Sequence, residues 1–251
     1  MIKIDQLEKQ YSTKTVIDQI SLEIPKGKIT SIIGPNGAGK STLLGMISRT
    51  IERNGGRVLI DEIDVKDWES NDLAKHLGIL KQSDSVNARI TIEDLVGFGR
   101  YPYSKGRLTE EDRRIMNQAI GYMDLESIRL SYLDELSGGQ RQRAYIASIL
   151  AQDTDYILLD EPLNNLDMKY ASEFLKILRR LVDDLEKTIV IVIHDINFAS
   201  CYSDYIVLLK EGKLAKKGTV REIMDAKVLE EIYDMPFNVL EVDGKLICAY
   251  Y

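Results

Sequence analysis

The sequence predicts one α/β domain with a mostly parallel central sheet, an antiparallel β portion at the N-terminus and an inserted helical segment. Apolar strand runs alternate with helical patterning, a glycine-rich turn joins one strand run to a helix, and a long central segment has helical spacing alone. The chain has 251 residues, of which 44% are hydrophobic and 29% charged, so it can bury a full core as one large domain.

The first 30 residues predict the antiparallel portion. Residues 2–4 and 21–24 alternate apolar and polar side chains, and Pro25 and Gly27 mark a turn before the next strand run. Tyr11 lies between these segments, where a single tyrosine is ordinarily a half-buried strand residue.

Several apolar runs predict strands that are buried on both faces. These runs are residues 29–33, 77–80, 156–159 and 188–193. The polar or glycine groups that follow them are Gly34, Gln82, the pair Asp160 and Glu161, and His194. Ligands of an open parallel sheet sit beyond the carboxyl ends of its strands, so these endings should converge on one site.

A glycine-rich loop follows the first of these runs and matches the pattern of a phosphate-binding P-loop. The loop and the start of its helix comprise Gly34, Pro35, Asn36, Gly37, Ala38, Gly39, Lys40, Ser41 and Thr42. Its backbone N–H groups should surround a nucleotide polyphosphate, with Lys40 on the terminal phosphates and the Ser41 hydroxyl on Mg²⁺. The alternative is a glycine turn that merely closes a strand-helix unit. The flanking elements favour the NTPase core.

Two acids end the third run, and each has a use in a P-loop enzyme. Asp160 would hold the metal through a water, and Glu161 would polarise the attacking water. Paired acids beside Pro162 can also form a solvated turn, but the P-loop upstream favours the functional interpretation.

The segment from Ser137 to Gln140 opens a predicted helix. Ser137 and Gln140 have capping-box spacing, so a purely structural account exists. Gly138 and Gly139 are poor choices for a cap alone and suit a helix end that approaches a phosphate.

Helical patterning dominates residues 83–154, and we expect this segment to be a helical subdomain inserted into a core of residues 1–82 and 155–217. A helix should start at Thr109, and another should span residues 168–187. Residues 218–251 should form a C-terminal extension, with short helices at 220–224 and 228–233 and a hairpin at 238–251.

Charge and composition limit the partners and the location. With 33 basic and 40 acidic residues the net charge is -7, which argues against general binding to nucleic acid or anionic lipid. Cys201 and Cys248 should be reduced thiols. No signal peptide and no membrane-spanning run are recognisable, so we expect a cytosolic protein.

The combined motifs resemble the ATP-binding cassette (ABC) family over nearly the whole chain. The resemblance rests on the signature-like residues 136–140 preceding Asp160 and Glu161, with the P-loop upstream and His194 downstream. It implies ATP and Mg²⁺ as cofactors and a homodimer in which each signature closes over the nucleotide of the other chain.

The resemblance also implies residue roles. Ser137, Gly138, Gly139 and Gln140 would contact the partner chain's nucleotide, and Tyr11 would stack on adenine. Lys40, Glu161 and His194 would act in hydrolysis together with Gln82, which would also sense Mg²⁺ and the permease. Asp167 would communicate across the dimer.

Residues 89–103 and 163–168 resemble the ATPases of ferric-siderophore and vitamin B12 importers, most of all the siderophore branch. This implies a peripheral protein on the cytoplasmic face of the membrane, where residues 83–105 dock onto a separate permease that works with a substrate-binding lipoprotein. The docking segment could equally be an ordinary packed loop. Haem, cobalamin or another metal chelate is an alternative cargo.

Departures and rivals complete the prediction. Asn164 and Asn165 replace the small residues commonest there, and Ser148 replaces a frequent arginine. These changes put the family's cross-dimer contacts in doubt without affecting hydrolysis. Trp68 should be a surface anchor and His76 a helix-face residue.

A soluble clamp acting on DNA or the ribosome and a non-catalytic scaffold are the rival functions. The chain has neither the tandem cassette nor the long coiled coil typical of clamps, and its Glu161 and His194 argue against a scaffold.

Overall fold

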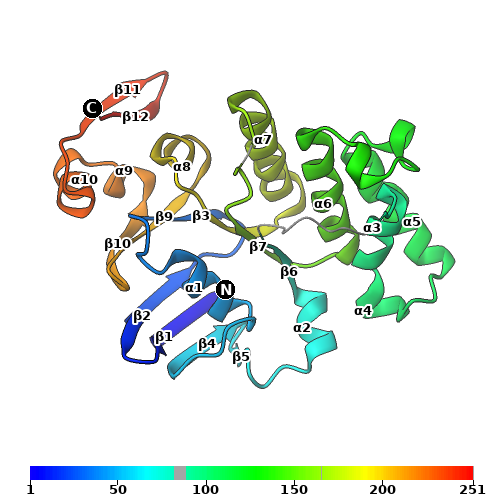
Figure 1. Cartoon of the computed structure of the whole chain (residues 1–251), viewed down its shortest axis with the longest axis horizontal. Helices are drawn as coiled ribbons and strands as arrows, with labels where there is room; N and C mark the ends of the chain where they lie inside the picture. Colours follow the sequence, from blue (N-terminus) through cyan, green and yellow to red (C-terminus); the bar gives the residue numbers. More distant parts are fainter. Residues whose placement is uncertain (82–88, 165, 251) are drawn as a thin grey trace.

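A six-stranded sheet forms the centre of the protein in this computed structural model, which describes residues 1–81, 89–164 and 166–250 (Figure 1). The strands lie in the order β10, β9, β3, β8, β7 and β6, and all neighbours are parallel except the edge strand β10. Their bounds are β3 Ile29–Ile33, β6 Leu77–Leu80, β7 Tyr156–Asp160, β8 Thr188–Val192, β9 Tyr205–Lys210 and β10 Lys213–Thr219. The buried strand runs predicted from the sequence are therefore confirmed as strands of one sheet.

These strands are apolar on both faces because both faces are covered. Along β8, Ile189 and Ile191 join a core with helices α6 (Gly138–Gln152) and α7 (Met168–Leu185). The alternate residues Val190 and Val192 join a second core beneath the N-terminal strands. Successive side chains of a strand point to opposite faces, so a continuous apolar run is what two-sided burial requires.

The N-terminal portion is an antiparallel sheet with the order β2, β1, β4 and β5. Its strands are β1 Ile2–Tyr11, β2 Lys14–Ile24, β4 Gly55–Ile60 and β5 Ile63–Asp64. The antiparallel prediction is confirmed, but β1 and β2 are much longer than the short segments expected. Register shifts along their pairing break the alternation that a sequence pattern can detect.

The helical region and the C-terminal extension lie at opposite ends of the molecule (Figure 1). The helical region contains α3 Ile92–Gly99, α4 Tyr101–Ser104, α5 Glu110–Tyr122 and α6. The extension contains α9 Val220–Ile223, α10 Ala226–Tyr233, β11 Asn238–Val242 and β12 Lys245–Ala249. The predicted helix start at Thr109 is confirmed by a capping box with Asp112, and the terminal hairpin is confirmed as well. The remaining helices are α1 Lys40–Ile47, α2 Ser70–His76 and α8 Ile196–Tyr202.

Ser148, one of the departures from the family pattern, lies where α6 meets α3. Its hydroxyl donates to the Leu95 carbonyl at 2.9 Å. A Cβ on Gly99 would come within 2.1 Å of the Ser148 carbonyl oxygen, so the two helices approach as closely as their backbones permit. The close approach therefore requires glycine at position 99, and the Ser148 hydroxyl adds a hydrogen bond between α3 and α6.

A buried ion pair stabilises the same contact between α3 and α6. The Arg100 guanidinium donates to Asp112 Oδ1 at 2.9 Å and to the Ala151 carbonyl at 2.8 Å, and both charged residues are about 4% exposed. Burial alone would raise the pKa of Asp112, but hydrogen bonds from Thr109 and Arg100 outweigh burial and hold that pKa below its ordinary value. The pair connects α3, α5 and the end of α6.

Two residues expected to be structural are indeed packing residues. The Trp68 and His76 ring centroids lie 4.6 Å apart, and Trp68 is half-buried against the N-terminal core instead of being a pure surface anchor.

Cys201 and Cys248 are free thiols, as expected. None of the helices in residues 1–81, 89–164 and 166–250 combines the length and the apolarity that a membrane span requires.

Arg100→Met should lower the free energy of unfolding by about 3 kcal/mol, because it leaves the Asp112 carboxylate buried without its partner. The control is Arg114→Met, whose partner Glu111 is exposed like Arg114 itself. That change should cost less than about 1 kcal/mol. Urea unfolding of the three proteins measures both differences. Equal losses in the two variants would contradict a structural role for the buried pair.

Candidate functional site

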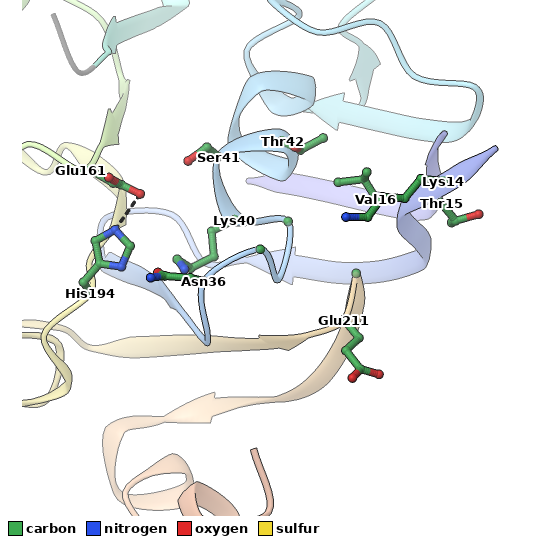
Figure 2. A pocket seen from close by; sticks show the side chains of 13 residues that line it. Lys14, Thr15, Val16, Asn36, Lys40, Ser41, Thr42, Glu161, His194 and Glu211 are labelled. Atoms are coloured by element: carbon green, nitrogen blue, oxygen red, sulfur yellow. Dashed lines mark ion pairs between the residues drawn. The ribbon is translucent and has the colours of Figure 1, made fainter. Parts of the chain in front are cut away.

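The carboxyl ends of β3, β8 and β7 meet at one edge of the sheet because these strands are parallel neighbours. A pocket of about 490 Å³ opens there, which we call the strand-end pocket (Figure 2). It is lined by Lys14, Thr15, Val16, Asn36, Gly37, Gly39, Lys40, Ser41, Thr42, Glu161, His194, Glu211 and Gly212. Of the predicted strand endings, Glu161 and His194 line this pocket. Asp160 and Gly34 are not in its lining but bond to the lining residues Ser41 and Lys40. Gln82 lies outside the described residues.

Two glycines of the loop are dictated by close backbone approach. A Cβ on Gly34 would lie 2.1 Å from the Leu209 carbonyl oxygen of β9. Gly39 has φ +97°, and its Cβ would lie 2.8 Å from the Val16 carbonyl oxygen of β2. The loop is held between β9 and β2, so its N–H groups are positioned before any ligand arrives.

Lys40 is buried beneath this loop with only 5% of its surface exposed. Its ammonium donates to the carbonyl oxygens of Gly34 at 2.9 Å and Pro35 at 3.0 Å. Burial lowers the pKa of Lys40, while the negative charges of Glu161 and Asp160 offset part of that shift. A buried cation of this kind is well placed to bind an anion that enters the pocket.

Ser41 and Asp160 form an oxygen pair next to the loop. The Ser41 hydroxyl donates to Asp160 Oδ1 at 2.8 Å. Burial raises the pKa of Asp160, the hydrogen bond from Ser41 opposes this rise, and the charge of Glu161 adds to it. Hydroxyl and carboxylate oxygens fit Mg²⁺, which takes few protein ligands and keeps waters and phosphate oxygens. Among the described residues, no group of three or more His, Cys, Asp or Glu side chains could hold a metal ion by itself.

Glu161 and His194 point toward each other on one side of the pocket (Figure 2). His194 Nε2 lies 2.7 Å from Glu161 Oε1, and the Glu161 side chain is 18% exposed against 41% for His194. Glu161 has φ +49°, a left-handed conformation that is uncommon for a residue with a long side chain. Backbone strain of this kind is often found at functional sites.

The structure adds residues that no motif marked. Lys14, Thr15 and Val16 reach the pocket from β2, and Glu211 reaches it from the turn between β9 and β10. They are brought there by contacts between distant segments, so no local pattern in the sequence could have indicated them. Asn164, which the sequence marks only as a departure from the family pattern, donates from its side-chain amide to Glu161 Oε2 at 2.7 Å.

The signature residues do not line the strand-end pocket. Ser137 caps α6, with its hydroxyl accepting from the Gln140 N–H at 3.3 Å and the Gln140 side chain accepting from the Ser137 N–H at 2.9 Å. Ser137, Gly139 and Gln140 line a separate hollow of about 370 Å³ beside Tyr170. Within one chain, the P-loop and the signature are therefore in different places.

The two signature glycines have different surroundings. A Cβ on Gly139 would lie 2.6 Å from the Tyr170 ring, whereas a Cβ on Gly138 would meet nothing closer than Leu166 at 3.5 Å. Packing inside the chain therefore accounts for Gly139. It does not account for Gly138, which is open to an outside contact.

The other predicted residues have local explanations. Tyr11 ends β1, pairs with Lys14 and is 47% exposed, with the Lys9 ammonium 4.7 Å from its ring centroid. Tyr11 is not part of the pocket lining, whereas its strand partner Lys14 is. Asp167 caps α7 by accepting from the Tyr170 N–H at 3.0 Å. Ala38 is buried in the loop.

Comparison with known proteins places the chain among transport ATPases. The ABC transporter family matches residues 17–164. The chain is 57% identical over 251 residues to the petrobactin import ATP-binding protein YclP of Bacillus subtilis (strain 168), with 100% of both chains covered. It is 49% identical over 250 residues to the petrobactin import ATP-binding protein FatE of Bacillus anthracis, again with 100% of both covered.

Solved structures support the same fold. The dimeric structure of MJ0796, a bacterial ABC transporter cassette, superimposes with a TM-score of 0.77 at 31% identity and covers 88% of this chain and 99% of that one. A dimeric post-hydrolysis state of MJ0796 bound to ADP and Pi gives a TM-score of 0.76 with the same identity and coverage.

Gly139→Ala should lower the free energy of unfolding by about 1 to 3 kcal/mol, because the added methyl group overlaps the Tyr170 ring. Gly138→Ala should change it by less than about 0.5 kcal/mol. Thermal and urea unfolding of the nucleotide-free chain check both values. In the double variant Gly139→Ala with Tyr170→Ala, the methyl group should cost nothing beyond the loss of the ring. Equal stabilities of Gly138→Ala and Gly139→Ala would refute this account of Gly139.

Proposed function

The chain belongs to the ABC transporter family and is an ATPase subunit of that family. We propose that it powers the import of a ferric siderophore and that this siderophore is petrobactin. The cargo proposal is supported by the two petrobactin import relatives, which match over their whole lengths at 57% and 49% identity. Haem, cobalamin or another chelate is the alternative. The chain would not touch the cargo itself, because the permease carries it.

ATP would bind in the strand-end pocket. The loop N–H groups and the start of α1 would surround the β- and γ-phosphates, and the Lys40 ammonium would turn from the loop carbonyls to the phosphates. Ser41 and Asp160 would hold Mg²⁺, which neutralises charge on the β- and γ-phosphate oxygens when bound. The exposed Tyr11 ring would stack on the base.

Hydrolysis would depend on Glu161 and His194. In the reaction, the oxygen of a water bonds to the γ-phosphorus, the bond from that phosphorus to the β–γ bridging oxygen breaks, and a proton leaves the water. Glu161 would orient the water and accept its proton, and His194 would contact the γ-phosphate. Positioning and charge stabilisation supply most of the rate in such reactions, which suits a site of amides, one lysine and one base.

The proposed active unit is a homodimer. Ser137, Gly138 and Gly139 lie away from their own chain's strand-end pocket, and Gly138 is open to an outside contact. In a head-to-tail pair, the N-terminus of α6 from one chain would face the γ-phosphate bound by the other. MJ0796, which shares this fold, has been solved as a dimer.

The permease would dock on α3 and α4. Phe98 and Tyr101 are 59% and 61% exposed, which is unusual for aromatic side chains, whereas Tyr103 is 40% exposed with the Arg100 guanidinium 3.9 Å from its ring centroid. Beside them lies a hollow of about 410 Å³ whose lining includes Gly97, Phe98 and Tyr101. A short helix of the permease could seat an apolar side chain there. The protein would then work as a peripheral subunit on the cytoplasmic face of the membrane, and the substrate-binding lipoprotein would contact only the permease.

Glu161→Gln should keep ATP binding and lose about 10²-fold or more of turnover, because the amide cannot accept the proton of the attacking water. Nucleotide affinity from calorimetry and phosphate release from the purified chain measure the two effects separately. Near-normal hydrolysis by this variant would remove Glu161 from its proposed role.

Phe98→Asp should abolish co-purification with the permease and siderophore uptake, because a charge replaces an apolar contact in the proposed interface. The ATPase rate of the isolated chain should stay within about twofold of wild type, since Phe98 is not part of the lining of the strand-end pocket. The control is Leu130→Asp, which changes a residue of the same region that is 67% exposed. If both variants assemble normally, the permease does not bind at α3 and α4.

A further inference from the structure

We propose that Asn164 is a positioning residue for hydrolysis: it holds one carboxylate oxygen of Glu161 so that the other is free for the attacking water once His194 turns to the phosphate. The inference rests on the proposed ATPase role of Glu161 and adds a residue to it. It also gives a function to a position where the chain departs from the family pattern.

The geometry fixes the Glu161 carboxylate at both ends. Asn164 Nδ2 donates to Oε2 at 2.7 Å, and His194 Nε2 lies 2.7 Å from Oε1. Separately, the Asn164 backbone N–H donates to the Glu161 carbonyl oxygen at 3.2 Å and closes the turn after β7. The backbone bond shapes the turn, so the side chain of Asn164 is not needed for that purpose.

The two partners of Glu161 differ in what they can do next. The His194 side chain is 41% exposed and lines the strand-end pocket, so an incoming γ-phosphate can attract its N–H away from Glu161. Asn164 is not among the residues that line that pocket. Its neutral amide is also a weaker phosphate ligand than a cation, so its bond to Oε2 can remain when His194 leaves.

A single remaining bond has a large effect on this side chain. A glutamate has several rotatable bonds, and ordering it costs side-chain conformational entropy. Without Asn164, the departure of His194 would leave the carboxylate to sample orientations that do not face the water. Asn164 therefore holds the Glu161 carboxylate in the orientation that catalysis by positioning requires before the water attacks.

There is room for a water where this arrangement needs one. A hollow of about 680 Å³ borders Gly34, Pro35, Asn36, Glu161, Asn164, His194 and Tyr233. The Glu161 carboxylate and the start of the P-loop both face this space. A water between Oε1 and a γ-phosphate held by the loop would lie within it.

Asn164→Ala tests the proposal in the full-length chain. We expect kcat to fall by about tenfold, as for loss of a hydrogen bond to a charged group, and KM for ATP to change by less than about twofold. Asn164→Asp, which has the same size but places a second carboxylate beside Oε2, should lose at least as much. Asn71→Ala, on the exposed side of α2, is the matched control and should behave as wild type. A wild-type kcat for Asn164→Ala would overturn the proposal.

A second measurement separates positioning of Glu161 from a contact across the dimer. In the Glu161→Gln background, adding Asn164→Ala should slow single-turnover hydrolysis by less than about twofold, because the base that Asn164 positions is already missing. The ATP-dependent dimer of that background should form equally well with either residue at 164. A full additional tenfold loss, or loss of the dimer, would show that Asn164 acts elsewhere. If wild type itself fails to hydrolyse MgATP, the proposed function fails and this inference with it, whereas an active wild type matched by Asn164→Ala defeats the inference alone.

Discussion

The triphosphate charge is the constraint on which the rest of this structure depends. Removing several negative charges from water is costly unless donors and cations are already in place to receive them. The chain meets this requirement with a loop held between β9 and β2 at Gly34 and Gly39, and with a Lys40 ammonium that rests on loop carbonyls. The parallel order of β3, β8 and β7 then brings His194, Asp160 and Glu161 to the same edge, so the sheet topology itself assembles the chemistry.

The sequence predicts the parts of the fold and site that depend on local pattern. Apolar runs located β3, β6, β7 and β8, and the motif spacing located the P-loop and the capped start of α6. It did not predict β4, β5 or β10, whose side chains are partly exposed. Nor did it predict β9, although the buried apolar residues of β9 form a run of the same kind as those of β3 and β8. The roles proposed for individual site residues remain predictions that the experiments above address.

Three residues gain a structural explanation only from contacts that the sequence pattern does not specify. Asn164 appears as a mere departure until its amide is seen on Glu161, and Ser148 until its hydroxyl is seen on the Leu95 carbonyl. For Gly139, the Tyr170 ring gives a packing reason for glycine in addition to the phosphate contact that the signature predicts. For Ser148 and Gly139 the deciding partner comes from tertiary packing, whereas Asn164 meets Glu161 three residues away within one turn. Spacing along the chain encodes neither the tertiary partners nor the side-chain geometry of that turn.

The head-to-tail pairing of two chains is the central claim, and a disulfide trap tests it most directly. Cysteines at Asn36 and Ser137, placed in a chain whose Cys201 and Cys248 are changed to serine and which also carries Glu161→Gln, would join the P-loop of one chain to the signature of the other. The account predicts rapid crosslinking into covalent dimers with MgATP and little without nucleotide. Chains that bind MgATP yet remain uncrosslinked monomers under oxidation would contradict it.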